Sequence, residues 1–216
     1  MPARDRRLAA YAMMVGAGFA ASDKMKADIV YSGPVSIAIP VTSAGVYLNV
    51  ITGATGFSSA GTPGWDVNPW SATTLNFFNP STPSGGVYVT GGGSSATLVD
   101  NLGLGTLVSG ASVFGSGMAE TTGSTAFSLN SPNNFVGFRF LNEATGIVNY
   151  GWLQISLGAS LTDPARAIVG YAYENTGGAI LTPIDLPAPE PSSFALLGMM
   201  AAGAIGVRAW RRRRGA

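Results

Sequence analysis

Cysteine and histidine are both absent from the 216-residue chain, and their absence excludes several classes of function at once. Without cysteine there is no disulfide, thiol nucleophile, thiolate zinc site or iron–sulfur cluster. Without histidine there is no Ser-His-Asp triad, no histidine-ligated metal and no side chain that ordinarily titrates near neutral pH. These absences exclude most hydrolytic and redox chemistry, and we expect a non-enzymatic protein with no cofactor and no assigned metal ligands.

Charge is scarce as well, at 11% of the residues, and the basic residues gather at the two ends. Between residues 28 and 185 there are two basic and eight acidic residues, which give this stretch a net charge of −6. Nucleic-acid binding needs lysine and arginine clustered on one face. We therefore expect no nucleic-acid partner.

The N-terminal end has the pattern of a secretory signal peptide. Three arginines near the start precede the uncharged run from Leu8 to Ala21, which has the length of a signal-peptide core and is too short to span a bilayer. We predict a signal-peptide helix within residues 1–27, with cleavage after Ala20 or after Ala27. The alternative is a short buried helix.

The C-terminal end has three parts in a fixed order. A proline-rich spacer over residues 186–193 contains Pro189, Glu190 and Pro191, and the uncharged run from Phe194 to Val207 follows it. The prolines predict an extended spacer that a protease can reach. We predict a short transmembrane helix over residues 193–210, held by a basic cluster that stays on the cytoplasmic side. The cluster consists of Arg208, Arg211, Arg212, Arg213 and Arg214.

Together these three parts resemble the PEP-CTERM sorting signal of Gram-negative bacteria, which would occupy residues 186–214. The resemblance implies that an exosortase, an integral-membrane enzyme, recognises the Pro189-Glu190-Pro191 motif and cleaves near it. It also implies transient anchorage in the inner membrane, a final location at the cell surface or outside the cell, and a setting of exopolysaccharide and biofilm. The alternative is a permanent tail anchor, for which the apolar run is short and rich in glycine.

The middle of the chain, residues 28–185, has the alternation of β-strands. Val35, Ile37 and Ile39 alternate with smaller residues, and further short runs lie at 46–50, 75–78, 87–90, 96–99, 125–129, 135–141, 147–157 and 167–174. Turn-forming residues separate the runs, and no amphipathic helix lies between them. We predict one secreted all-β domain, an antiparallel β-sandwich or jelly roll. Its last three runs are also similar to the final strands of secreted domains that precede this sorting signal, which implies a fold and no activity.

The sequence indicates ligand-binding or catalytic sites within this domain less strongly than it indicates the sorting signal. Eight aromatic residues could form a sugar-stacking platform, although aromatics in a domain with so little charge are more often core. They are Trp65, Trp70, Phe77, Phe78, Tyr88, Trp152, Tyr171 and Tyr173. A glycoside hydrolase would need two converging carboxylates from among Glu120, Glu143, Glu174 and five aspartates, and nothing in the sequence pairs them.

Calcium and phosphate sites have weaker sequence signals still. Asp66 and Asn68 have the spacing of a calcium loop, but no glutamate follows at the required distance, so only an irregular calcium site stays open. The glycine-rich stretches lack the full pattern of a phosphate-binding loop.

The sequence therefore predicts an exported, non-catalytic component of the cell surface or extracellular matrix. Exosortase is the predicted partner, and exopolysaccharide is a second partner left open. One rival interpretation is a carbohydrate-binding module, which an exposed aromatic row on a sheet face would favour. A glycan-processing hydrolase is the other.

Overall fold

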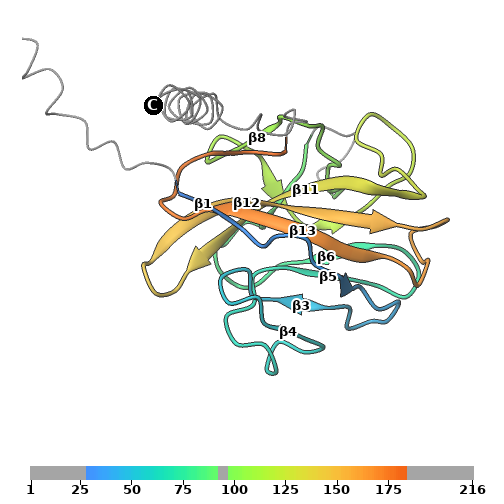
Figure 1. Cartoon of the computed structure of the whole chain (residues 1–216), viewed down its shortest axis with the longest axis horizontal. Helices are drawn as coiled ribbons and strands as arrows, with labels where there is room; N and C mark the ends of the chain where they lie inside the picture. Colours follow the sequence, from blue (N-terminus) through green and yellow to red (C-terminus); the bar gives the residue numbers. More distant parts are fainter. Residues whose placement is uncertain (1–27, 92–96, 184–216) are drawn as a thin grey trace, which may run out of the picture. The chain divides into compact units, whose positions relative to one another are not determined.

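The computed structural model describes residues 28–91 and 97–183, which form fourteen β-strands and no helix. All pairs of neighbouring strands run antiparallel. The predicted all-β, antiparallel architecture is confirmed (Figure 1). The strands are β1 (Ile29–Tyr31), β2 (Ile37–Ala38), β3 (Tyr47–Leu48), β4 (Thr55–Gly56), β5 (Asn68–Trp70), β6 (Asn76–Phe78), β7 (Tyr88–Val89), β8 (Leu107–Val108), β9 (Phe114–Gly115), β10 (Gly117–Met118), β11 (Ser131–Asn142), β12 (Ile147–Leu157), β13 (Ala167–Glu174) and β14 (Ile180–Leu181).

Three long strands, β11, β12 and β13, form the middle of the largest sheet, whose order is β1-β13-β12-β11-β7-β9, with β2 also paired to β13. β11 and β12 form a hairpin. In its turn, the side-chain oxygen of Asn142 accepts a hydrogen bond from the Ala144 amide at 3.0 Å, and its carbonyl accepts one from the Gly146 amide at 2.7 Å. Gly146 has φ +71°, a conformation in which glycine avoids the strain of a side chain.

The long strands bury both of their faces. One face carries Phe138 and Phe140 of β11 with Leu153 of β12, and it shares a core with Leu48 and Phe77 of the smaller sheets. On the opposite face, residues that include Trp152 share a second core with β8 and β14. Figure 1 shows β8 on one side of the long strands and β3, β5 and β6 on the other. The alternation of β12 that the sequence predicted therefore separates two cores.

Arg166, just before β13, is fully buried and ties three loop segments together. Its five guanidinium hydrogens are all donated to backbone carbonyls at 2.6–3.0 Å, which satisfies every donor of the side chain. The acceptors are the carbonyl oxygens of Ile39, Pro40, Ser71, Thr74 and Leu161. Burial lowers the pKa of the guanidinium from its usual value.

The predicted strand over residues 125–129 is wrong, because no strand lies there. In the run at 96–99, the described residues form only isolated bridges, at Leu98 and Val99. Phe127 is buried in the first core, which accounts for the hydrophobic signal. The neighbouring backbone pairs with scattered partners, since the Phe127 amide bonds to the Glu120 carbonyl and the Ser128 amide to the Asn134 side chain. This apolar run therefore anchors a loop.

Candidate ligand-binding surface

The eight aromatic candidates divide into a buried group and a surface group. Five belong to the cores, where their burial stabilises the fold: Phe77, Tyr88, Trp152, Tyr171 and Tyr173. The other three, Trp65, Trp70 and Phe78, line hollows at the surface. The general expectation that aromatics here are core therefore holds for most of the set, and it fails around β5 and β6.

Trp65, Trp70 and Phe78, together with Tyr47 of β3, form what we call the aromatic surface. Phe78 is 52% exposed, and its ring lies 5.9 Å from that of Trp65, with the two planes only 14° apart. Tyr47 meets Trp65 edge to face, with centroids 4.8 Å apart. These contacts restrict the rings of Tyr47, Trp65 and Phe78 before any ligand arrives, which lowers the entropy that these side chains lose on binding.

Strand alternation produces this surface. In β6, Phe77 points into the core, and the next residue, Phe78, points to solvent. In β5, Trp70 lies opposite Asn76 of β6. The hydroxyl of buried Tyr88 donates to the Phe78 carbonyl at 3.1 Å and accepts from the Asn68 amide at 2.8 Å, which ties the two strands together behind the surface. Burial raises the pKa of Tyr88, so the hydroxyl keeps its proton at neutral pH.

Phe78 borders three hollows. The largest, of about 500 Å³, is the Trp65 cleft, and a second, of about 360 Å³, lies toward Trp70 and Met118. The third, of about 180 Å³, reaches Tyr47 and Ser43. Because one exposed ring borders all three, they form a run of hollows that could hold more than one unit of an extended ligand. The lining of the Trp65 cleft consists of Gly64, Trp65, Phe78, Asn79, Pro80, Ser81, Thr82 and Glu143.

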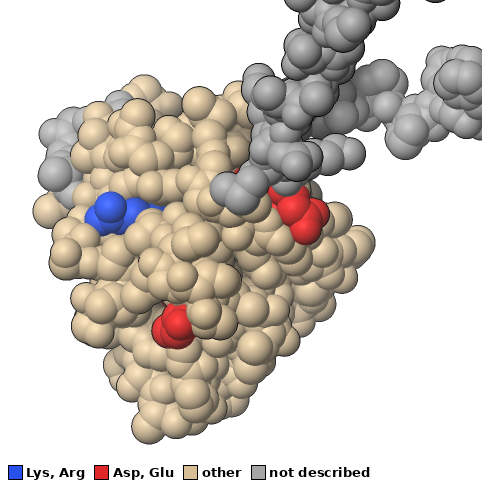
Figure 2. All heavy atoms as spheres, turned by 90° about the vertical axis from the view of Figure 1, so that its left-hand side faces the viewer, with Lys and Arg blue, Asp and Glu red and all other residues tan. Residues whose placement is uncertain are grey.

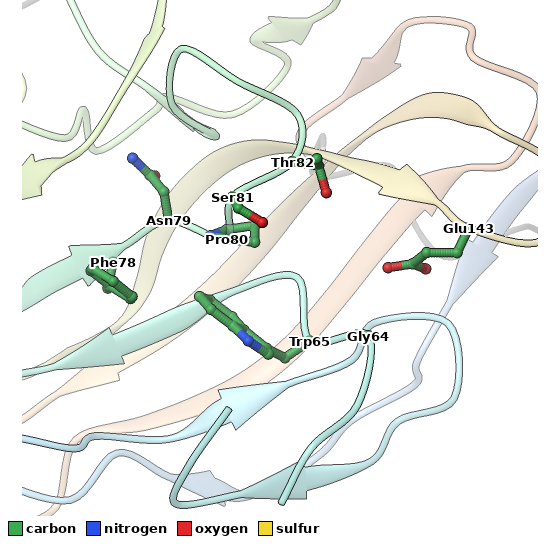
Figure 3. A pocket seen from close by; sticks show the side chains of 8 residues that line it. All are labelled: Gly64, Trp65, Phe78, Asn79, Pro80, Ser81, Thr82 and Glu143. Atoms are coloured by element: carbon green, nitrogen blue, oxygen red, sulfur yellow. The ribbon is translucent and has the colours of Figure 1, made fainter. Parts of the chain in front are cut away.

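Three segments that are distant in sequence build the Trp65 cleft. Trp65 precedes β5, Ser81 and Thr82 follow β6, and Glu143 comes from the turn between β11 and β12. In Figure 3, the oxygens of Ser81, Thr82 and Glu143 point into the space above the Trp65 ring. The cleft thus combines an aromatic floor with two hydroxyls and one carboxylate.

Asp66 is buried next to this cleft without lining it. Its carboxylate accepts a hydrogen bond from the Val50 amide at 2.8 Å. Burial raises the pKa of Asp66 to about 7, the Val50 hydrogen bond opposes that rise, and the negative charge of Glu143 adds to it. The two carboxylates therefore interact, and Asp66 changes its protonation near neutral pH.

The side chains of Asp66 and Asn68 form hydrogen bonds with the backbone of the domain. While Asp66 holds the Val50 amide, the Asn68 side chain donates to the carbonyls of Ala44 and Val46, both at 3.0 Å. Residues 28–91 and 97–183 contain no group of three acidic side chains able to hold a metal ion.

The three candidate glutamates lie in different settings. Among them, only Glu143 lines the Trp65 cleft. Glu174 is fully buried, and its carboxylate accepts hydrogen bonds from Thr176 and from the Gly178 amide in the turn after β13. Glu120 is half-buried in the loop after β10. The structure therefore brings no two of these glutamates together.

Sequence reasoning missed several residues of this site. Tyr47 was not among the aromatic candidates, and neither Ser81 nor Thr82 was singled out. The pair Phe77-Phe78 carried a partial signal, because two successive aromatics in a strand point to opposite faces, but the pair does not tell which of them is exposed. No local signal marks Glu143, since its approach to Trp65 depends on how distant segments pack.

The comparisons with known proteins identify the C-terminal end of the chain. Residues 187–214 match the family model of the PEP-CTERM protein-sorting motif. The chain thus joins an all-β domain to this sorting motif, and the recognition made from the sequence is confirmed. No curated protein and no solved structure matches the chain.

Several predictions concern residues outside those that the structure describes. They are the signal peptide over 1–27, the helix over 193–210, the Pro189-Glu190-Pro191 motif and the basic cluster of Arg208 and Arg211 to Arg214, and each stays a prediction. The boundary at residue 185 also stays a prediction. In the described part of the chain, no helix is long and apolar enough to span a membrane.

Proposed function

We propose that this protein is an exported, non-catalytic component of the cell surface or extracellular matrix that an exosortase sorts. The sorting motif at residues 187–214 carries the proposal. The signal peptide directs export, and the helix over 193–210 with its arginines then holds the chain in the inner membrane. Cleavage near Pro189-Glu190-Pro191 releases the domain toward an exopolysaccharide matrix. We also propose that the all-β domain is a β-sandwich, since the core between its long strands and its smaller sheets supports that architecture.

Mass spectrometry of the mature C-terminus tests the sorting step. In cells with the sorting enzyme we expect a terminus near Glu190, and in cells without it we expect a chain that still carries Arg211 to Arg214. Glu190→Ala should give the uncleaved form in normal cells, while the control Glu120→Ala should be processed like the wild type. A normal strain whose mature protein keeps the arginines would reduce the signal to a tail anchor.

The aromatic surface favours a second function, carbohydrate binding. Flat, exposed aromatic rings with nearby hydroxyls suit the apolar faces and hydroxyl groups of sugar rings. Phe78 supplies an exposed ring and half-buried Trp65 supplies a second, beside Ser81 and Thr82. We propose that the domain holds matrix polysaccharide here.

Binding of the exported mature protein to the producer's own polysaccharide tests this second function. We expect Phe78→Ala to weaken binding about tenfold or more, since it removes a ring that borders all three hollows. The matched control is Phe57→Ala, because Phe57 is 69% exposed and borders none of these hollows. Equal binding by the wild type and both variants would count against the site.

The non-catalytic part of the proposal is supported by the lining of the Trp65 cleft. A glycosidase presents two carboxyl groups to its substrate, one on each side of the scissile bond. Glu143 is the single carboxylate among the lining residues, and Asp66 is engaged behind it. Absence of sugar release from the same polysaccharide would support this assignment, and release that depends on Glu143 would overturn it.

A further inference from the structure

The lining of the Trp65 cleft contains one charged side chain, the carboxylate of Glu143. Glu143 supplies a carboxylate at its rim, and its lining contains no lysine or arginine. Glu143 is exposed, so its charge is available to a ligand. Buried Asp66 lies close enough for its ionisation to respond to Glu143, and it adds negative potential as it ionises.

Both arginines of the domain are engaged elsewhere. Arg166 is buried, with its five hydrogens donated to carbonyls. Arg139 donates to the carbonyls of Gly86 and Ser84 and lies over the Phe114 ring, 4.6 Å from its centroid. Figure 2 shows a molecular face on which charged side chains are few and scattered. Within residues 28–91 and 97–183, no cationic patch therefore offers a site for an anionic polymer, and the cleft is complementary to a cation.

We propose that the Trp65 cleft binds polysaccharide that contains hexosamine with a free amino group. This inference rests on the proposed carbohydrate binding and names its substrate class. The apolar face of the sugar ring stacks on Trp65 and Phe78, and the protonated amine pairs with the Glu143 carboxylate beside the Trp65 ring. Ser81 and Thr82 exchange hydrogen bonds with the sugar hydroxyls. An acetylated amine is neutral and lacks the ion pair.

Two oligosaccharides of equal length test the proposal, one of glucosamine and one of N-acetylglucosamine. Titration of the exported mature protein should give about three- to fivefold tighter binding of the glucosamine oligomer, as expected for an exposed ion pair. Added salt should reduce this preference. Glu143→Gln should abolish it without weakening binding of the acetylated oligomer, and Glu143→Lys should reverse it.

Two controls separate this site from general attraction between a polycation and an acidic protein. Glu120→Gln removes one negative charge away from the cleft, and it should keep the preference for glucosamine. Phe78→Ala should weaken binding of both oligomers. Equal loss of preference in Glu120→Gln and Glu143→Gln would overturn the proposal.

The remaining outcomes distinguish failure of the inference from failure of carbohydrate binding. Equal affinity for the two oligomers, with both affinities dependent on Phe78, would overturn the amine inference and leave carbohydrate binding supported. Phe78-dependent binding to the producer's polysaccharide, without binding to either oligomer, would do the same. Absence of binding to all three ligands would overturn both.

Discussion

At the scale of single residues, the buried Arg166 side chain donates five hydrogen bonds to backbone carbonyls. Arg166→Met would leave five carbonyl groups without their donor, and each buried unsatisfied group is costly. We expect the free energy of unfolding to fall by about 3–5 kcal/mol, measured by urea denaturation. Arg166→Lys should recover only part of this loss, because one ammonium cannot reach acceptors on all sides of the guanidinium plane.

A matched control for Arg166 is Arg139→Met. Arg139 is half-buried and donates to two carbonyls, so its loss should cost about 1–2 kcal/mol. If Arg166→Met unfolded at the same urea concentration as the wild type, the proposed role of this side chain in joining the loops would be wrong.

Asp66 should make stability depend on pH in the direction opposite to most carboxylates. Its pKa of about 7 in the folded state lies above the ordinary value of 3.8, so the folded state binds the proton more tightly than the unfolded state. The free energy of unfolding therefore falls as pH rises from about 4 to about 7, by up to ~4 kcal/mol, and is level above that range. Asp66→Asn should remove this fall and exceed the wild type in stability at pH 8. Urea midpoints of both proteins at pH 5 and pH 8 measure the difference.

Asp163 provides the contrasting case for the same titration. Hydrogen bonds from the amides of Ala165 and Ala159 lower the pKa of Asp163, so its contribution is present at neutral pH and lost in acid. Asp163→Asn should therefore matter more at pH 7 than at pH 3. If Asp66→Asn showed the same sign of pH dependence as Asp163→Asn, burial would not be the dominant influence on Asp66.

At the scale of elements, β12 depends on a glycine at its centre. Gly151 lies opposite Phe138 of β11, and a Cβ atom there would come within 2.6 Å of the Phe138 ring and 2.5 Å of the Ala172 carbonyl oxygen. Phe138 is fully buried, so the ring has little space into which to move. We expect Gly151→Ala to cost about 1–3 kcal/mol, measured by thermal or urea unfolding.

Gly170 in the neighbouring strand β13 is the control for this effect. A Cβ atom at Gly170 would meet its nearest neighbour, the Tyr31 hydroxyl, at 3.5 Å, which is ordinary contact. Gly170→Ala should change stability by less than about 0.5 kcal/mol or raise it slightly, because alanine restricts the unfolded chain. Equal effects at the two positions would show that backbone entropy, and not the packing of Phe138, governs β12.

The long strands were predictable from the sequence, and many of the short ones were not. In β12 and β13 the alternation continues over 11 and 8 residues, so the boundaries follow from the pattern. Around Val35 to Ile39 the alternation is equally clear, yet β2 contains only Ile37 and Ala38. Val35 lies outside β2, and its amide donates a hydrogen bond to the carbonyl of Val169 in β13. Alternation reports burial, whereas strand pairing depends on a partner that the local sequence does not specify.

The sequence predicted the chemical type of the candidate site, an aromatic surface, but not its position. An exposed aromatic row on one sheet face was the mark expected of a carbohydrate-binding module, and the aromatic surface meets it only in part, since Phe78 is exposed while Tyr47, Trp65 and Trp70 are half-buried. Its position on β5 and β6 could not be read from the sequence, because Phe77 and Phe78 are chemically identical and only the sheet decides which one is exposed. Glu143 lies 78 residues after Trp65 in the sequence and reaches the cleft through the turn between β11 and β12.

At the scale of the whole molecule, processing should change the sign of the net charge. The full chain carries +1, the form cleaved after Ala27 carries −2, and a form also cleaved before Glu190 carries −6. Charge of this size governs solubility and long-range attraction. We expect native isoelectric focusing to resolve the three forms, with the mature form the most acidic. The form accumulated without the sorting enzyme should match −2 if the signal peptide is cleaved after Ala27, or −1 if it is cleaved after Ala20.

The net charge after processing can also be measured by anion-exchange chromatography, and it bears on which matrix polysaccharide the protein attracts. The mature form should bind an anion exchanger at pH 7 and low salt, and elute after the form that still carries its C-terminal arginines, because the latter has the smaller negative charge. The same acidic charge would repel a polyanionic polysaccharide and attract one with free amines, in agreement with the position of Glu143 in the Trp65 cleft. If protein from normal cells eluted together with protein from cells that lack the sorting enzyme, cleavage near Glu190 would not have occurred. The negative charge that attracts an amino polysaccharide to the protein would then be smaller.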